Sequence, residues 1–467
     1  MQMRHSNDIA ATIFRFTRGY IRDNGIMGIH LNSFETPGGG VDRKYALRHA
    51  VLLLFADPPQ ISPRFGVLSL GEWKRLLRWM DISGMTVYFL DRAEELGLAT
   101  AIPSSTYAQM KSRLESNRER TAMLMADSVD IQAAFRREGV PYALAKGNSY
   151  NPDSVPKLWL RSQTDLDFLV AKECAENARR VLEDRGYKVR KETARIWEFA
   201  TDHIARWGAP EDAYRPRQGR RVELHLETDG PDTRLARRLE RDFNGVKMPV
   251  LSPPDIFIGQ ALHCYRNICS QYSRLSQYLE FYRHAHTRRN DVEFWCQVRA
   301  LCGNDPSVAV RIGASLRLMT ELMGDFAPDA LTAWTMDRLS PAAHLWFELY
   351  SRRKALGSPP GTKLHLLLQE ELRPIGVASD MSTRRILFPI VKPPVIVYPT
   401  PQENFAARFH RYSFQARFVL YQARFHIVEI VRISWHSMRW QKLVARQEQT
   451  RNPHANKEMA MTHVHED

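Results

Sequence analysis

The chain of 467 residues is predicted to have an α+β fold that is mostly helical, with one small mixed sheet and flanking helices. Three observations predict it. Apolar residues recur at three- and four-residue steps over much of the chain, as on the buried face of a helix. Two short segments instead alternate apolar and polar residues with the period of two that is typical of strands. Acidic side chains occupy one face of each, so the sheet is expected to carry the functional site.

The region before the sheet is predicted to be helical, after a flexible break with the sequence PGGG at residues 37–40. Helices are expected over residues 43–55, as a pair over residues 71–98, and as one long helix from Thr106 to about Gly139. A short helix is also expected before residue 40. In the long helix we expect three arginines on exposed turns and three apolar side chains facing inward: Arg113, Arg118 and Arg120, and Met123, Met125 and Ile131.

The strongest indication of chemistry lies in residues 142–170. An apolar run, predicted to be a strand, is followed by a loop and by a second apolar strand that carries Asp165 and Asp167. Residues two apart on a strand point to the same face, so the two carboxylates are expected side by side. Such a pair needs a cation between its charges, and Mg²⁺ favours carboxylate and phosphate oxygens. The alternative for an isolated Asp-x-Asp pattern is a solvated strand face.

The turn after the first apolar run has the composition of a phosphate-binding turn. Gly147 allows a ligand to approach the backbone closely, and Asn148 and Ser149 could open a helix whose N-terminus attracts phosphate. Lys146 precedes this turn, and Arg161 lies four residues before Asp165, where it could reach a charged phosphate oxygen.

A third carboxylate is expected from residues 221–227, with the sequence RVELHLE. The valine and leucines share one face of this predicted strand, and Glu223, His225 and Glu227 share the other. Glu223 is the expected partner of the two aspartates, with Asp202 and Glu227 as competing candidates. His225 is expected to orient its acidic neighbour rather than to bind a metal. The alternative is an acidic strand that faces solvent.

These motifs resemble the nucleotidyltransferase superfamily with its polymerase-β-like fold, and more narrowly the bacterial uncharacterised nucleotidyltransferase family. The resemblance covers roughly residues 125–330. The chain departs from the pattern in three places: Asn148 separates glycine from serine, the loop from there to Asp165 is long, and Leu226 stands where the family usually has Trp. The resemblance is carried by LAKG at 144–147, RSQTDLDFLV at 161–170, Gly186-Tyr187, VELH at 222–225, LSPPD at 251–255 and His263.

The resemblance implies transfer of a nucleoside monophosphate from an NTP to an acceptor, with release of pyrophosphate. Asp165 and Asp167 would bridge two Mg²⁺ ions and Glu223 would complete the metal shell. The turn of Gly147, Asn148 and Ser149 would hold the β- and γ-phosphates, with Lys146 and Arg161 adding positive charge. His263 and Arg266 could also reach phosphate, although a core position is the simpler interpretation of His263.

The resemblance and the helical patterns together predict four regions. Residues 1–125 form an N-terminal helical region, and residues 126–250 form the polymerase-β-like nucleotidyltransferase core. Residues 251–335 form a helical extension that packs on the core. Residues 336–467 form a C-terminal helical region with a basic amphipathic helix and a disordered tail.

The basic helix is expected between residues 414 and 444. It could bind a membrane surface, an RNA backbone or a partner helix, or pack on its own domain with an arginine-rich edge in solvent. The pattern consists of one apolar series, Phe418, Tyr421, Phe425, Val428, Val431, Trp435 and Met438, and one arginine series, Arg417, Arg424, Arg432, Arg439 and Arg446.

Composition restricts the partners and the compartment. A net charge of +14 and a pI near 9.6 favour polyanionic partners such as nucleotides, RNA, DNA or an anionic membrane surface. The five cysteines match no zinc spacing and are expected to be free thiols in a reducing cytoplasm. Neither a signal peptide nor a transmembrane segment is expected.

The sequence does not identify the acceptor, which could be a small molecule, a peptide, a protein or tRNA. The alternative function is a non-catalytic protein that keeps the nucleotidyltransferase fold and binds RNA or an anionic membrane surface. A toxin that modifies tRNA or a protein is a third hypothesis.

Overall fold

The computed structural model describes residues 43–201, 210–216, 219–228, 230–243, 245–303, 305–373, 383–388 and 404–451. Predictions that lie outside these ranges are the flexible break at residues 37–40, the short helix before residue 40, the placement of Asp202, and the part of the predicted tail after residue 451. The tail was predicted to be disordered from Gln447, but its first residues, 447–451, are helical.

The described residues include one mixed sheet of seven strands in the order β3-β4-β5-β2-β1-β7-β6. β2 pairs in parallel with β5, and β1 with β7, whereas the other neighbours are antiparallel. With the many helices around it, this sheet confirms the prediction of a mostly helical α+β fold. The strands are β1 (Tyr142–Leu144), β2 (Leu166–Ala171), β3 (Lys188–Glu192), β4 (Ile196–Ala200), β5 (Arg221–Glu227), β6 (Leu239–Phe243) and β7 (Val246–Val250).

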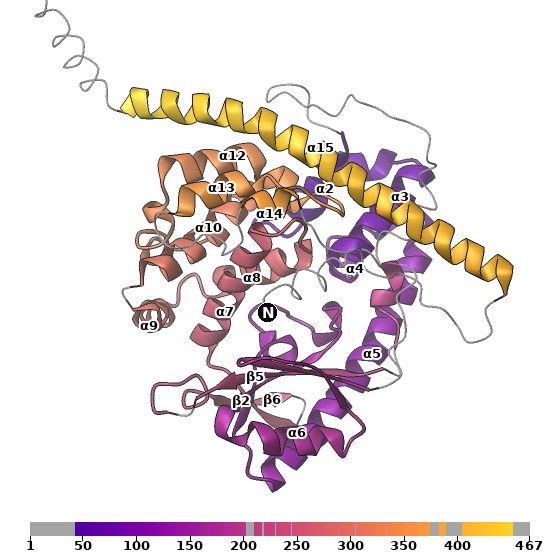
Figure 1. The fold of residues 1–467 in the computed structure, drawn as a ribbon, viewed down its shortest axis with the longest axis vertical. Helices are drawn as coiled ribbons and strands as arrows, with labels where there is room; N and C mark the ends of the chain where they lie inside the picture. The colour runs from indigo at the N-terminus through magenta and orange to yellow at the C-terminus, as the bar shows by residue number, and fades with distance from the viewer. Residues whose placement is uncertain are drawn as a thin grey trace, which may run out of the picture.

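Helices α5 (Ser104–Arg137) and α6 (Ala175–Glu183) cover one face of the sheet, as Figure 1 shows. The apolar alternation of β2 and β5 explains this contact, because Phe168 and Leu224 belong to the same buried cluster as Phe135 of α5 and Leu182 of α6. The rings of Phe135 and Phe168 meet edge to face, with centroids 5.5 Å apart. This layer fixes which residues of β2 and β5 point the other way.

The opposite face of the sheet packs against a helical body, which is formed by segments that precede and follow the sheet in the sequence (Figure 1). Trp73, which precedes the sheet, and Trp346, which follows it, are buried in one continuous core that also contains Leu169 of β2. The helices of this body are α2 (Arg43–Leu53), α3 (Leu70–Ser83), α4 (Thr86–Glu95), α7 (Pro253–Ile268), α8 (Leu275–Thr287), α9 (Val292–Cys302), α10 (Pro306–Met323), α11 (Asp329–Thr332), α12 (Pro341–Ala355), α13 (His365–Leu372) and α14 (Thr383–Leu387).

Local sequence explains where several of these helices begin. Ser69 caps α3, and Glu72 returns a hydrogen bond to the cap, so both ends of a capping box are present. Ser252 caps α7 ahead of two prolines in its first turn. Short 3-10 helices join the longer elements at Pro63–Val67, Leu98–Ala101, Gly147–Tyr150, Leu158–Leu160, Lys172–Cys174, Pro210–Ala213 and Met336–Arg338.

The orientation predicted for the long helix α5 is partly wrong. Arg120 is buried and donates a hydrogen bond to the carbonyl of Ala213, whereas Met123 is 41% exposed. Arg113 makes a bidentate ion pair with the buried Asp81. The reason is that the first half of α5 packs on the helical body and the second half on the sheet, so no single stripe faces inward. α5 also runs across the predicted boundary at residue 125, and the division into four regions stays a prediction.

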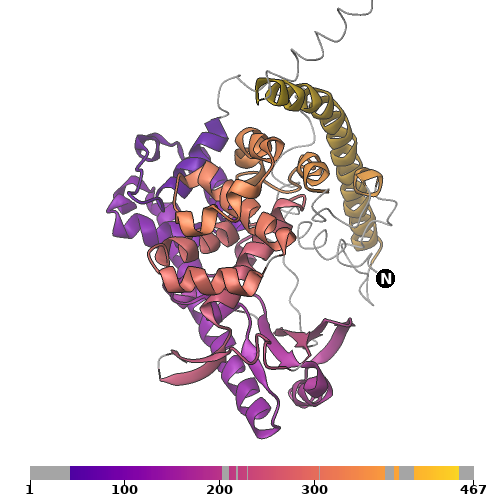
Figure 2. The same cartoon turned by 90° about the vertical axis from the view of Figure 1, so that its left-hand side faces the viewer.

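The last described helix, α15 (Phe405–Arg451), lies across the helical body on the side away from the sheet (Figures 1 and 2). Its apolar series was predicted to share one face, but Phe418 and Phe425 are buried while Val431 and Met438 are exposed. Helix α15 therefore has two apolar sides. Within the described ranges, no helix has both the length and the hydropathy needed to cross a membrane.

Candidate functional site

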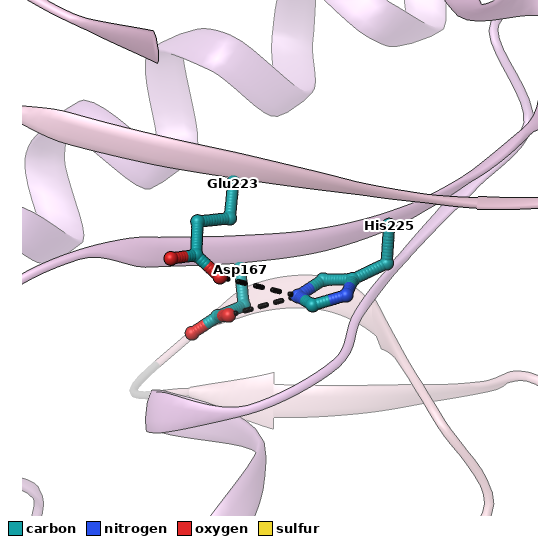
Figure 3. Close-up of side chains that lie close together, drawn as sticks. All are labelled: Asp167, Glu223 and His225. Atoms are coloured by element: carbon teal, nitrogen blue, oxygen red, sulfur yellow. Dashed lines mark hydrogen bonds and ion pairs between the residues drawn. The ribbon is translucent and has the colours of Figure 1, made fainter. Parts of the chain in front are cut away.

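Two carboxylates meet on the face of the sheet that looks toward the helical body. In the parallel register of β2 and β5, Asp167 lies opposite Glu223 and Leu169 lies opposite His225. The side chains of Asp167, Glu223 and His225 point toward one another (Figure 3), and their possible ligand atoms lie within 4.8 Å of one another. These three residues are called here the acidic cluster. It is formed by the register of two strands from distant parts of the sequence.

His225 joins the two carboxylates of the acidic cluster. Its Nε2 atom is 3.0 Å from Oδ1 of Asp167 and 3.6 Å from Oε2 of Glu223 (Figure 3). The expected role of His225, to orient an acidic neighbour, stays a prediction.

Lys146 supplies a positive charge to the same cluster. Its Nζ atom lies 2.6 Å from Oδ1 of Asp167, 3.7 Å from Oε2 of Glu223 and 3.3 Å from Nε2 of His225. In this structure, the residue expected beside a phosphate therefore pairs with carboxylates. The ammonium group takes the part of the cation that two adjacent carboxylates require.

Interactions within the cluster shift the pKa values of its members in different directions. Although burial raises the pKa of Asp167, the Lys146 ammonium and the His225 hydrogen bond hold it well below its usual range. Burial and the charges of Asp167 and Asp165 raise the pKa of Glu223 to about 8. Burial opposes a charged Lys146, but Asp167 and Glu223 raise its pKa above its usual value. The group is therefore built to hold positive charge between Asp167 and Glu223.

Asp165 immediately precedes β2 and is thus not on the strand that was predicted to carry it. Its Oδ1 accepts a hydrogen bond of 3.3 Å from the hydroxyl of Thr164. Burial and the charge of Asp167 raise the pKa of Asp165, and Asp165 in turn raises that of Glu223. The structure thus brings Asp167 and Glu223 into direct proximity and leaves Asp165 within electrostatic reach of both.

Gly147 connects the turn after β1 to the backbone at Asp165. Its φ of +65° lies in the left-handed region, and a Cβ at this position would lie 2.2 Å from Nε2 of Gln163. That same Nε2 donates a 2.6 Å hydrogen bond to the carbonyl of Asp165. Glycine is therefore required for packing between the turn and the aspartate segment, a reason that the sequence did not reveal.

The turn itself differs from the expected helix opening. Residues Gly147–Tyr150 form a single 3-10 helix, in which Asn148 and Ser149 are 4% and 1% exposed. The Nδ2 of Asn148 lies 3.7 Å from the sulfur of Met125, and the carbonyl of Ser149 accepts a hydrogen bond from Arg241. The helix that Asn148 and Ser149 were expected to open is a single 3-10 turn that begins at Gly147. Their contact with phosphate stays a prediction.

Arg161 is fixed to the helical body. Its Nε is 3.2 Å from Oε2 of the buried Glu280 on α8, and its guanidinium lies 5.0 Å from the ring centroid of Tyr150. The hydroxyl of Tyr88 donates to the other oxygen of Glu280. Glu280 and Gln163 position candidate site residues, but no local motif identifies Glu280, since it lies 119 positions from its partner.

Glu227 and Asp202 were the other candidates for the third carboxylate of the site. Glu227, at the far end of β5, accepts hydrogen bonds from Nε of Arg234 and the backbone amide of Leu235. It therefore holds a neighbouring loop, whereas Glu223 is the residue opposite Asp167. Asp202 lies outside the described residues.

Helix α7 faces the cluster with two further candidates. Burial and the charge of Arg266 lower the pKa of His263 to about 3, with Lys146 contributing. Burial lowers the pKa of Arg266, while Tyr150 and Glu223 act in the opposite direction. His263 is therefore a neutral, half-buried side chain, and Arg266 is a cation within electrostatic reach of Glu223.

The donor set fits a divalent cation. Two carboxylates suit Mg²⁺ or Mn²⁺, and an imidazole nitrogen suits Zn²⁺. The positive charge that Lys146 places among these atoms shows that the arrangement stabilises a cation.

Comparison with known families identifies the chain. Residues 69–324, more than half of its length, match the family described as uncharacterised nucleotidyltransferase. The chain belongs to this family, which confirms the resemblance seen in the sequence. The matched segment runs from the capping residue of α3 to the end of α10 and includes the acidic cluster.

Other comparisons add little. Among solved structures, an antigenic nucleotidyltransferase-like protein from Paracoccidioides brasiliensis is 14% identical, over 47% of this chain and 97% of that chain, with a TM-score of 0.25. A TM-score this low supports no argument about the site. A comparison with curated proteins gives no match.

Proposed function

We propose that the protein transfers a nucleoside monophosphate from an NTP to an acceptor nucleophile, using Mg²⁺ and releasing pyrophosphate. The observation that carries the proposal is the parallel register that sets Asp167 opposite Glu223, in a chain that belongs to a nucleotidyltransferase family. Asp165, one position before β2, is the third carboxylate of the proposed site.

The reaction forms a bond from an acceptor oxygen or nitrogen to the α-phosphorus. The bond from that phosphorus to the oxygen bridging to the β-phosphate breaks, and pyrophosphate leaves with its electron pair. The acceptor proton passes to Glu223 or to solvent. Two bound Mg²⁺ ions would neutralise the charge on the transferred phosphoryl group and on pyrophosphate.

The cluster residues have separate parts in this proposal. Asp165 and Asp167 would hold both ions, Glu223 would complete the shell of one, and His225 would keep Asp167 oriented. Once cations neutralise the carboxylates, the ammonium of Lys146 can pair with a phosphate oxygen.

The remaining phosphate contacts are proposed for Gly147, Asn148 and Ser149, supported by Arg161. The turn packs against Gln163 at Gly147 and against Met125 at Asn148. Arg161 is held in place by its ion pair with Glu280.

The test is metal-dependent turnover of each NTP, with cell extract as the source of acceptor and pyrophosphate release as the readout. Asp167→Asn and Glu223→Gln are expected to lower turnover by at least about a hundredfold, with thermal unfolding showing that the variants fold. The matched control is Glu227→Gln on the same strand, because Glu227 pairs with Arg234 outside the cluster. Absence of Mg²⁺-dependent pyrophosphate release by the wild type, or full activity of Asp167→Asn, would contradict the proposal.

One observation favours the alternative of a non-catalytic protein with this fold. The ion pair between Lys146 and Asp167 neutralises the cluster without a metal, as a binding protein that has no need of cations would require. The same assay separates the two functions. We also propose that the protein acts in a reducing compartment that contains NTPs, such as the cytoplasm. The five free thiols support this location.

A further inference from the structure

The outer side of helix α15 is an exposed apolar stripe. Leu420, Ile427, Val431 and Met438 are between 49% and 69% exposed. They follow one another at steps of seven, four and seven residues, which places them along one line of the helix at about 100° per residue. Phe409, eleven residues before Leu420, continues the line and is 68% exposed.

The opposite side of α15 already holds the helix to the protein. Phe418, Phe425, Ile433 and Trp440 are buried there. Nε1 of Trp440 also donates to Glu371 on α13. The exposed stripe is therefore a second apolar side that no core contact explains, and no segment in the described part of the chain covers it.

A row of cations borders the stripe. Arg417, Arg424 and Lys442 are exposed and lie three or four residues from the stripe residues, which makes them neighbours on the helix surface. The only acid between Phe405 and Arg446 is Glu429. It is fully buried and accepts hydrogen bonds from Thr362 and from the backbone of Lys363. Between Phe405 and Arg446 the outward side of α15 thus combines apolar groups and positive charge without an exposed acid.

We propose that this side of α15 docks the protein on the surface of an anionic lipid bilayer. A helix of 47 residues is about 70 Å long, and lying flat it presents the stripe to acyl chains and the cations to lipid headgroups. The position of α15 at the periphery of the helical body allows this contact (Figure 2). An RNA backbone would use the arginines but would leave the apolar stripe in water. The inference does not depend on transferase activity.

The test is cosedimentation of the full-length protein with vesicles. One vesicle contains phosphatidylcholine alone, and the other contains phosphatidylcholine and phosphatidylglycerol in a 2:1 ratio. Wild-type protein is expected to bind the anionic vesicle and to lose binding as salt rises. Ile427→Glu with Val431→Glu is expected to abolish binding, while the control Val292→Glu, an exposed apolar residue of α9, leaves it unchanged.

Replacing Arg417, Arg424 and Lys442 by Gln removes three cations near the surface, each contributing about fivefold. Binding to anionic vesicles is expected to fall about a hundredfold, with the thermal unfolding midpoint unchanged. The proposal is overturned if wild-type protein does not bind the anionic vesicle, or if the Ile427/Val431 variant binds as well as wild type. It is also overturned if that variant only converts a dimer to a monomer, which would assign the stripe to a second copy. Tight RNA binding without vesicle binding would equally overturn it.

Discussion

The ammonium of Lys146 lies 2.6 Å from Oδ1 of Asp167, on the side of the sheet that faces the helical body. The contact joins the turn after β1 to the beginning of β2, and Glu223 of β5 lies 3.7 Å from the same ammonium. A positive charge among paired carboxylates stabilises the protein without a divalent cation, and it must give way when one binds. Lys146 thereby couples the stability of the protein to occupation of its proposed site.

Replacing Lys146 by Met should expose this coupling. The variant leaves Asp167 and Glu223 without their cation, so the free energy of unfolding should fall by about 1–3 kcal/mol. Added Mg²⁺ or Mn²⁺ should then raise the melting temperature more than it does in the wild type. The control is Lys157→Met, because Lys157 makes an equally short contact with Asp91 outside the cluster. Equal cation responses of wild type and Lys146→Met would refute the coupling.

Gly147→Ala tests the contact between the turn and Asp165. The new Cβ would meet Gln163, whose amide holds the carbonyl of Asp165. The free energy of unfolding of the variant should fall by about 1–2 kcal/mol because its backbone is left-handed here, and by a further amount because of the steric contact. Gly139→Ala has a φ of +64° and no atom within 4 Å of its Cβ, so it measures the backbone cost alone. If denaturant unfolding gives the same loss for both variants, the packing argument is wrong.

Arg161 should act as a structural partner of Glu280. Arg161→Met leaves a carboxylate that is 3% exposed without its cation, which should cost about 3–5 kcal/mol. The double variant Arg161→Met with Glu280→Met should be more stable than that single variant, because neither charge is then buried alone. By contrast, Arg179→Met breaks an exposed pair with Glu183 and should cost less than about 1 kcal/mol. A double-mutant cycle from urea unfolding measures the coupling, and a value near zero would exclude this role.

The stability of the protein should fall in mild acid because of His284. Burial lowers its pKa to about 4, with Asp153 raising it and Arg288 and Arg241 lowering it. Between pH 6.5 and 4 the unfolded chain binds a proton that the folded protein excludes. This histidine therefore contributes its full stability above pH 6.5 and loses about 1.4 kcal/mol per pH unit as the pH falls through that window.

His284→Gln should flatten the acid limb of the stability curve by one proton. His410→Gln, at an exposed position of α15, is the matched control and should leave the slope unchanged. Chemical unfolding at several pH values gives both slopes. If His284→Gln keeps the slope of the wild type, another group causes the acid loss.

Local patterns were sufficient to predict the strands that carry the candidate site. β5 was predicted with its observed bounds, and β2 nearly so, since the alternation of side chains along a strand depends on neighbouring residues. β6 and β7 were not predicted, because LERDF and VKMPV contain no clear alternation. The orientation of α5 was missed for another reason: its two halves pack on different layers, and one periodic stripe cannot describe both.

The sequence by itself determined the class of fold, the family and the faces on which Asp167 and Glu223 lie, because side-chain alternation along a strand is a local property. Only the tertiary structure decided that these two residues are opposite each other, that Lys146 lies between them and that Arg161 belongs to Glu280. These are contacts between residues 21 to 119 positions apart. Strand register and helix packing create them, and neither is encoded within a single segment of the chain.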